Sequence, residues 1–156
     1  MPSEYLTKKG YKKLQKELDH LRDVKRKEVA DRLHEAAESS LGEFVEDPEF
    51  EAAKNEQAFV EGRIRELEAT LANASIINHR KKSNGVVQIG SRVTIREGRR
   101  NPEEYLIVGN AEADPRNGKI SHESPFGSAL LEKKEGEKAE IEAPDGSFTV
   151  KIVKVK

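Results

Sequence analysis

The stretch that decides the fold spans residues 48 to 74 and reads PEFEAAKNEQAFVEGRIRELEATLANA. Its apolar positions alternate between spacings of three and four over about three heptads, which is the pattern of a coiled-coil seam. The preceding Asp47 is suited to cap a helix, Pro48 suits the first helical position, and Glu49 adds negative charge to the first turn. We therefore predict a long helix that begins at Pro48. Its seam consists of Phe50, Ala53, Gln57, Val60, Ile64, Leu67, Leu71 and Ala74.

A second apolar stripe lies upstream, from Thr7 to about Ala37, with spacings that are mostly three or four. Thr7 is a plausible N-cap for this helix. Two helices of this length, joined by a short connection, can bury their stripes against each other, which predicts an antiparallel hairpin on the order of 40 to 45 Å long. Its tip is expected near residues 39 to 47. The upstream stripe consists of Tyr11, Leu14, Leu18, Leu21, Val24, Val29, Leu33 and Ala36.

Beyond Asn73 the helical period fades, and a polar, basic segment follows. Short β-type runs come next, with a turn at residues 144–146 and a short helix capped by Ser124. We predict a hairpin at 1–76, a linker at 77–85 and an α+β domain at 86–156, the last with an antiparallel sheet and one helix. The expected strands are 86–89, 92–96, 104–108, 138–143 and 148–152.

Composition excludes several classes of protein. Lys and Arg number 28 against 29 Asp and Glu, so a whole-molecule basic footprint for duplex nucleic acid is absent and any nucleic-acid contact must be local. The chain has no cysteine, which excludes disulfides, thiol nucleophiles and Cys-containing zinc sites. No apolar run has the length of a signal peptide or a membrane span, so we expect a cytoplasmic protein without a membrane partner.

Four carboxylates fall within seven residues at the expected tip: Glu43, Glu46, Asp47 and Glu49. Capping and first-turn electrostatics explain Asp47 and Glu49. For Glu43 and Glu46 the simple alternative is a solvated acidic turn. However, apolar side chains at 44–45 suggest a surface that docks, and Mg²⁺ commonly takes one or two carboxylates along with other oxygen ligands. Two acids are an incomplete metal site, so the sharper hypothesis is that they complete a site that another macromolecule begins.

Several short motifs give the chain a family resemblance along essentially its full length. These motifs are Tyr5-Leu6-Thr7, Gly10, Leu14, Glu49-Phe50-Glu51-Ala52-Ala53-Lys54, Glu61-Gly62-Arg63-Ile64, Ile89-Gly90-Ser91, Val93, Ile107-Val108-Gly109, Glu112-Ala113-Asp114, Ile120-Ser121, Ser124-Pro125 and Gly127-Ser128-Ala129-Leu130. In these residues the chain resembles the Gre family of bacterial transcript cleavage factors.

The resemblance implies a factor whose coiled coil enters the secondary channel of RNA polymerase while an FKBP-like second domain docks at the channel rim. Members of the family are not nucleases themselves. They stimulate the polymerase to hydrolyse the extruded 3′ end of a backtracked transcript, and two tip acids help to hold the second Mg²⁺ and its water. The implied partners are RNA polymerase and the nascent RNA 3′ end. No tightly bound cofactor is expected besides the Mg²⁺ shared with the polymerase, and the factor is expected to be a monomer.

Carried over by position, the two tip acids are Glu43 and Glu46, with assisting catalytic and metal-binding roles. The family's usual tip reads Gly-Asp-Leu-x-Glu-Asn-x-Glu-Tyr, whereas this chain reads Gly-Glu-Phe-Val-Glu-Asp-Pro-Glu-Phe over residues 42–50. The first acid is thus Glu instead of Asp, one methylene longer. Because Mg²⁺ demands near-ideal octahedral geometry, and a misplacement of about 1 Å costs on the order of a hundredfold in rate, this change bears directly on cleavage activity.

The resemblance also implies a basic patch that guides the RNA and a surface that docks on the polymerase. A basic residue is expected before the tip, where this chain has Ser39. The alternative for the three arginine and lysine candidates on the first helix is that they form solvated faces paired with acids, and for Ser124 and Pro125 it is simple helix capping. The RNA-contacting candidates are Lys54, Arg22, Lys25 and Arg26, and the docking candidates are Ser124, Pro125 and Asp114.

Three alternatives stay open beside the cleavage factor. A regulatory variant would occupy the same channel and modulate the polymerase without efficient cleavage. A prolyl isomerase with a helical appendage would need an aromatic-lined pocket, for which the second domain offers only Tyr105, Phe126 and Phe148. A plain coiled-coil scaffold would not bind polymerase at all.

Overall fold

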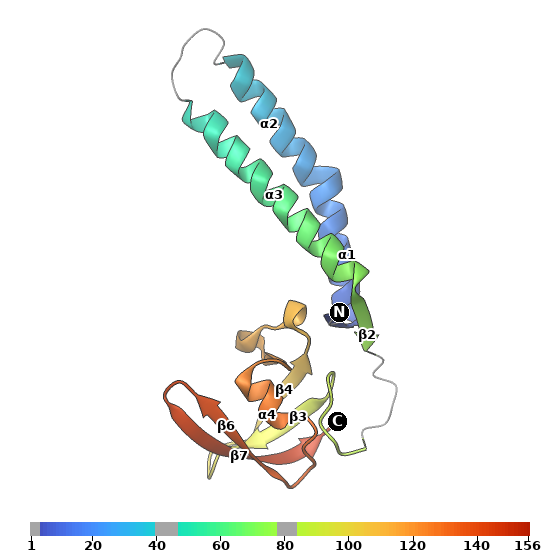
Figure 1. Cartoon of the computed structure of the whole chain (residues 1–156), viewed down its shortest axis with the longest axis vertical. Helices are drawn as coiled ribbons and strands as arrows, with labels where there is room; N and C mark the ends of the chain where they lie inside the picture. The colour runs from blue at the N-terminus through green and yellow to red at the C-terminus, as the bar shows by residue number, and fades with distance from the viewer. Residues whose placement is uncertain (1–3, 40–46, 78–83) are drawn as a thin grey trace. The chain divides into compact units, whose positions relative to one another are not determined.

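The computed structural model describes residues 4–39, 47–77 and 84–156, which group into two compact units (Figure 1). One unit, the hairpin unit, is Lys12–Asn73. The other, the sheet unit, combines Met1–Tyr11 with Ala74–Lys156. Glu43 and Glu46, the acids proposed for the tip, lie outside the described residues, as does most of the predicted linker.

The hairpin unit consists of two helical arms. The first arm contains α1 (Lys8–His20) from Lys12 onward, since the first four residues of α1 belong to the sheet unit, followed by the π-helical segment η1 (Leu21–Lys25) and α2 (Arg26–Ser39). The second arm is α3 (Pro48–Ala72), which packs along α2 (Figure 1). The predicted helical hairpin is therefore confirmed, and α3 begins at the residue that its Pro and N-cap predicted.

A single apolar stripe from each arm is buried in this hairpin. Gln57, which the sequence placed in the seam, is instead exposed, because burial of its polar amide would cost free energy without a hydrogen-bond partner. Val24 is also 40% exposed, and it lies in η1, where the predicted stripe has a gap of five residues before Val29. The buried residues are Leu14, Leu18, Val29, Ala36, Ala53, Val60, Ile64 and Leu67.

A five-stranded sheet in the order β5-β4-β3-β7-β6 forms the sheet unit. Neighbouring strands are antiparallel except for β4 and β5, which are parallel. That pair is an exception to the predicted antiparallel sheet, because the connection through two short 3-10 turns, η2 (Asn110–Glu112) and η3 (Pro115–Asn117), returns the chain so that β5 runs in the same direction as β4. The strands are β3 (Arg92–Arg96), β4 (Glu103–Val108), β5 (Lys119–Ser121), β6 (Lys138–Ala143) and β7 (Gly146–Val155).

One face of this sheet is covered by the short helix α4 (Pro125–Leu130), and the core lies between them. Burial alternates along β6 and along β7 as far as Ile152, so every second side chain there enters the core, and the irregular register between β3 and β7 accompanies the break in alternation before Val155. The predicted strand at residues 86–89 is wrong, since Val86 forms only an isolated bridge with Lys134. The core residues are Val87, Val93, Ile95, Ile107, Ile120, Leu130, Ala139, Ile141, Val150, Ile152 and Val155.

A two-stranded parallel pair, which the sequence did not predict, completes the sheet unit. Strand β1 (Glu4–Thr7) pairs with β2 (Ala74–Ile77), with Glu4 opposite Ala74 and Thr7 opposite Ile77. The predicted division placed residues 1–76 together, whereas β1 and β2 group with the sheet unit because β1 contacts η2 and β4. Within the described ranges, no helix is both long and apolar enough to cross a membrane.

Candidate functional site

The tip end of the hairpin, defined here as residues 35–39 and 47–51, is where α2 ends and α3 begins. Asp47 has an extended backbone, and its Oδ1 accepts a hydrogen bond from the Glu49 N–H at 3.0 Å. Pro48 takes the first helical position, where its missing N–H has no intrahelical partner to lose. The capping role predicted for Asp47 is thereby confirmed.

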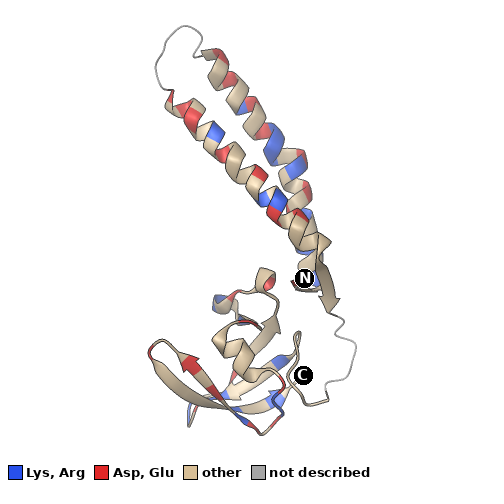
Figure 2. Cartoon of the chain, viewed as in Figure 1, with Lys and Arg blue, Asp and Glu red and all other residues tan. Residues whose placement is uncertain are grey.

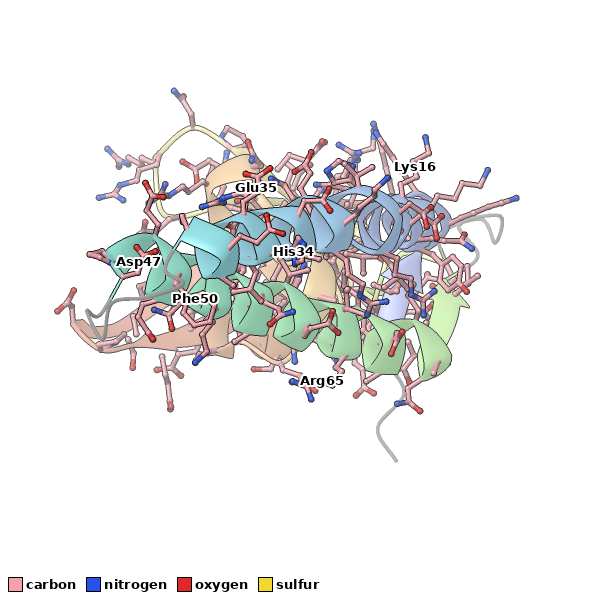
Figure 3. All side chains as sticks on the ribbon, turned by 90° about the horizontal axis from the view of Figure 1, so that it is seen from above. Lys16, His34, Glu35, Asp47, Phe50 and Arg65 are labelled. Atoms are coloured by element: carbon pink, nitrogen blue, oxygen red, sulfur yellow. The ribbon has the colours of Figure 1, made fainter. Side chains whose placement is uncertain are left out.

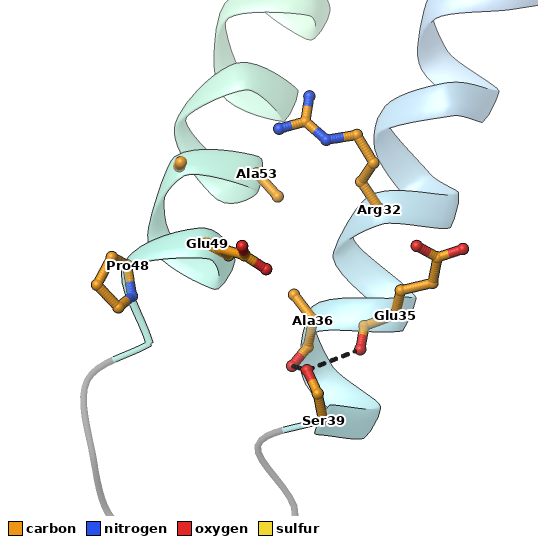
Figure 4. Close-up of a pocket in the computed structure, with 8 residues that line it drawn as sticks. Arg32, Glu35, Ala36, Ser39, Pro48, Glu49 and Ala53 are labelled. Atoms are coloured by element: carbon orange, nitrogen blue, oxygen red, sulfur yellow. Dashed lines mark hydrogen bonds between the residues drawn. The ribbon is translucent and has the colours of Figure 1, made fainter.

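An open cavity of about 620 Å³ lies between the two helix ends (Figure 4). Small side chains such as Ala36 and Ala53 line it at the point where the apolar stripe of the hairpin ends. The Ser39 hydroxyl donates to the Glu35 and Ala36 carbonyl oxygens, both at 3.1 Å, and so satisfies carbonyls in the last turn of α2. The lining residues are Arg32, Glu35, Ala36, Ser39, Pro48, Glu49, Ala52 and Ala53.

Acidic side chains dominate the tip end. Asp47, Glu49 and Glu51 lie at the N-terminus of α3, where the helix dipole stabilises negative charge. Glu35 and Glu38 lie in the last turns of α2, where the dipole offers no such stabilisation. Figure 3 shows Glu35 and Asp47 toward the same end of the hairpin, away from Lys16. Within the described part of the chain, no group of three or more His, Asp or Glu side chains could hold a metal ion.

Basic and acidic residues are interspersed along both helical arms (Figure 2), and each of the three basic candidates on the first arm has an acidic partner. Arg26 donates two hydrogen bonds to Glu61, at 2.7 and 2.9 Å, and Lys25 Nζ lies 3.5 Å from Glu28. The hydrogen bonding between Arg26 and Glu61 raises the pKa of Arg26 and lowers the pKa of Glu61. Arg22 pairs with Glu68 across the hairpin. These pairs are what the alternative interpretation, a solvated and ion-paired coiled-coil face, would produce.

Lys54 differs from those three residues. Its ammonium group lies 5.5 Å from the centroid of the Phe50 ring, and among the described ion pairs none includes it. A cation held over an aromatic ring keeps its charge available to an anion such as phosphate. Lys54 is therefore the candidate whose surroundings fit an RNA contact best.

Five exposed lysines of α1 were not among the predicted contacts. No described ion pair includes any of them. Their clustering in nine residues was the sequence signal that could have identified them. They are Lys8, Lys9, Lys12, Lys13 and Lys16.

The three docking candidates have different environments in the sheet unit. Ser124 Oγ accepts from the Gly127 N–H at 3.0 Å and donates to the Ser121 carbonyl at 2.7 Å, so it caps α4. Pro125, in the first position of α4, is exposed. The Asp114 carboxylate accepts from the Asn117 side chain at 2.6 Å and thus stabilises η3.

The three aromatic residues weighed for a prolyl isomerase come together around one cavity of about 160 Å³. The rings of Tyr105 and Phe126 meet edge to face, with centroids 5.1 Å apart. The Tyr105 hydroxyl donates to Glu103 at 2.5 Å, and this bond, aided by burial, raises the pKa of Tyr105 to about 12. The cavity is well below the roughly 300 Å³ of typical small-molecule sites. Its lining is Ile95, Glu97, Arg100, Asn101, Glu103, Tyr105, Phe126, Phe148 and Val150.

Comparison with known families accounts for both units. Residues 4–76 match the model described as "Transcription elongation factor, N-terminal", and residues 82–156 match "Transcription elongation factor, GreA/GreB, C-term". The chain belongs to the GreA/GreB family of transcription elongation factors. The resemblance seen in the sequence motifs is thus confirmed.

Individual members of this family are similar over nearly the whole chain. Transcription elongation factor GreA of Clostridium acetobutylicum is 46% identical over 97% of this chain and 95% of its own length. Transcription elongation factor GreA of Caldanaerobacter subterraneus subsp. tengcongensis is 48% identical over 97% of this chain and 96% of its own. Among solved structures, the GreA factor homolog 1 (Gfh1) of Thermus thermophilus is 32% identical, covers 99% of both chains and has a TM-score of 0.46.

Proposed function

We propose that this protein binds RNA polymerase and stimulates Mg²⁺-dependent cleavage of the 3′ end of backtracked RNA. The observation that carries the proposal is that both GreA/GreB family models match, one over each part of a chain built as a helical hairpin and a sheet domain. The helices of that hairpin end at Ser39 and begin again at Pro48, and residues 40–46, which include Glu43 and Glu46, connect them.

The chain acts in this proposal as a donor of ligands and not as an enzyme. Mg²⁺ bound in the polymerase would supply activation of the attacking water and stabilisation of the charge on the phosphate. Glu43 and Glu46 would contribute carboxylate oxygens, which are ligands that Mg²⁺ prefers. Asp47 is already engaged as the α3 cap, so its role is to fix the start of the helix beside these acids.

The decisive experiment uses a stalled, backtracked elongation complex with Mg²⁺ and scores the release of short 3′ RNA fragments. The wild-type chain is expected to release fragments, and Glu43→Ala and Glu46→Ala are each expected to abolish release while leaving polymerase binding intact. Loss of one metal-positioning carboxylate commonly costs a factor on the order of a hundred or more.

Glu51→Ala is the matched control for these variants. Glu51 is an exposed acid in the first turn of α3 and is engaged in no described ion pair. The variant is expected to release fragments at close to the wild-type rate. If Glu43→Ala and Glu46→Ala also cleave normally, the shared-site mechanism is wrong for this chain.

A second candidate, a channel-binding regulator without efficient cleavage, is favoured by one observation. Glu43 stands where the family pattern has Asp, and its extra methylene displaces the carboxylate on a scale that Mg²⁺ coordination does not tolerate well. A wild-type chain that slows elongation and releases no fragments selects this candidate. In that case Glu43→Asp is expected to restore release, whereas Glu46→Asp is not.

Contacts with RNA and polymerase complete the proposal. Lys54→Ala is expected to weaken fragment release through a higher half-saturating factor concentration in low salt, and its difference from wild type should shrink in high salt because ions screen a phosphate contact. The same assay ranks Arg22, Lys25 and Arg26, whose acidic partners compete for their charge. Pro125→Ala tests docking through polymerase affinity, and Ser124 and Asp114 are the further docking candidates.

A further inference from the structure

A hydrogen-bonded contact between Thr7 and Glu112, called the joint below, lies in the sheet unit where α1 begins. The Glu112 carboxylate, on η2, accepts from the Thr7 backbone N–H through Oε2 at 2.6 Å and from the Thr7 hydroxyl through Oε1 at 2.7 Å. Thr7 Oγ1 in turn accepts from the Gly10 N–H at 2.9 Å, which is the capping bond of α1. One carboxylate therefore supports the residue that caps the helix.

Two glycines allow the chain segments around the Thr7–Glu112 contact to pack closely. A Cβ at Gly109 would overlap the Tyr5 carbonyl oxygen, and a Cβ at Gly10 would overlap the Glu112 carboxylate. Both positions hold glycine, the residue without a Cβ, so backbone can approach this closely. Near them, Glu4 accepts from the Ala111 N–H at 2.9 Å and ties β1 to the same turn.

Because Thr7 is buried, loss of its hydrogen bonds to Glu112 should destabilise this part of the sheet unit. Thr7 is only 7% exposed and, within the described ranges, is the one polar residue classed with the buried core. Leu6 beside it is fully buried. A buried polar group that loses its partner is destabilising because water cannot replace that partner, whereas an exposed group hydrogen-bonds to water instead. Removal of the Glu112 carboxylate thus releases the Thr7 N–H and hydroxyl together.

We propose that Glu112 is a positioning residue that holds β1 and the first turn of α1 on the turn η2, and so governs how efficiently a bound factor uses its tip. This inference rests on the proposed function. The docking candidates Ser124 and Pro125 belong to the same unit as Glu112, whereas the tip acids follow α1 and α2 along the chain. A loosened α1 start lowers the effective concentration of the tip without removing the docking contact.

Variants at Glu112 separate the contribution of its hydrogen bonds from that of its charge. Glu112→Ala loses both acceptors. Glu112→Gln keeps an oxygen for the Thr7 N–H and gains an N–H that can donate to Thr7 Oγ1, so its geometry survives without the charge. The plateau is the effect that a saturating concentration of the factor has on a backtracked complex. We expect Glu112→Ala to lower this plateau about five- to tenfold, with less than about a twofold change in the factor concentration that gives half of it. Glu112→Gln should stay within about twofold of wild type in both quantities.

Two variants of Thr7 test the same contact independently. Thr7→Val keeps the shape and loses the hydroxyl, and it should reproduce the Glu112→Ala plateau. Thr7→Ser keeps the hydroxyl and should restore wild-type behaviour. Glu140→Ala is the control, because Glu140 is an exposed acid of β6 that pairs with Thr149 in the strand register, remote in sequence from the joint.

Amide hydrogen exchange at Thr7 and Gly10 reports on the joint itself. In the full-length chain, exchange at both amides should accelerate in Glu112→Ala and Thr7→Val and be unchanged in Glu112→Gln, Thr7→Ser and Glu140→Ala. Unchanged exchange in Glu112→Ala overturns the proposal. So does an unchanged plateau with faster exchange, or a Glu112→Gln variant as defective as Glu112→Ala.

Two further outcomes are distinguishable. A purely structural role for Glu112 would lower the plateau, the polymerase affinity and the melting temperature together, which also overturns positioning. A wild-type chain that neither cleaves nor slows the backtracked complex contradicts the proposed function. The exchange data would then still decide whether Glu112 holds the start of α1.

Discussion

The hairpin unit and the sheet unit bury apolar surface in different ways. The hairpin encloses one narrow stripe, and charged side chains cover the remaining surface of its helices, including the cross-arm pairs Arg26–Glu61 and Arg63–Glu17. The sheet unit encloses a continuous cluster between β-strands and α4. A two-layer core is closed on more sides than a two-helix seam. The hairpin is therefore the region whose surface is free to vary, and the sheet unit is the region that depends on close packing.

Truncation of a core residue in each unit tests this difference most strongly. Ile152 is fully buried in β7, and Ile64 is 2% exposed in α3. We expect Ile152→Ala to lower the free energy of unfolding by about 3 to 5 kcal/mol and Ile64→Ala by about 2 to 3 kcal/mol, because two helices can close partly over a cavity. Urea titrations read by circular dichroism and by strand amide signals measure the two units separately. Equal losses would contradict the comparison.

Two glycines test the same difference with opposite signs. Gly109 lies against the Tyr5 carbonyl oxygen, whereas a Cβ at Gly62, within α3, would meet nothing within 4 Å. Gly109→Ala should therefore destabilise the sheet unit by about 1 to 3 kcal/mol. Gly62→Ala should stabilise the hairpin by about 0.5 to 1 kcal/mol through better helix propensity. Thermal unfolding of both variants checks this, and a destabilised Gly62→Ala would show that α3 uses this glycine for contact.

The cap of α3 is the next largest effect. Asp47→Ala removes the acceptor of the Glu49 N–H and should cost about 1 kcal/mol in the hairpin. Asp47→Asn keeps an acceptor and serves as its control, with a smaller loss expected. Both are read from the helical signal in urea. If Asp47→Asn, which keeps the capping acceptor, abolishes fragment release, the Asp47 carboxylate contributes more than a helix start.

Titration of Tyr105 in the sheet unit is the smallest expected effect. Its pKa is raised to about 12 by the hydrogen bond to Glu103 and by burial. Since the folded state favours the protonated phenol, the stabilisation is fully present below pH about 10, the unfolded value, and is lost as pH rises toward about 12. Tyrosinate absorbance should show Tyr105 ionising near pH 12, and Glu103→Gln should lower the pKa of Tyr105 toward its ordinary value. If the pKa of Tyr105 is as high in Glu103→Gln as in the wild type, burial is the cause of the raised value.

Local sequence rules predicted the elements whose cause is local. The Asp47 cap, the α3 start at Pro48, the Ser124 cap of α4 and the strands β3 and β6 all follow from patterns within a few residues, and the structure confirms them. The family resemblance, carried by short motifs in both units, was confirmed by both family matches. The tip acids Glu43 and Glu46 stay a prediction.

The elements that sequence reasoning missed depend on partners far along the chain. Strand β1 has only four residues and pairs with β2 some seventy positions later, and β5 has three residues. Such short runs carry too little period to be recognised alone. The ion pairs of Arg22 and Arg26 likewise required the register of the two arms, which apolar spacing does not fix to the residue.

The sequence by itself determined that this chain forms a long hairpin followed by a β-rich domain, because helix and strand periods are properties of neighbouring residues. Only the tertiary structure decided that residues 4–7 belong with the sheet unit and that Glu112 meets Thr7 there. That contact joins residues 105 positions apart, and its free energy comes from burial and bond geometry that exist once the chain has folded.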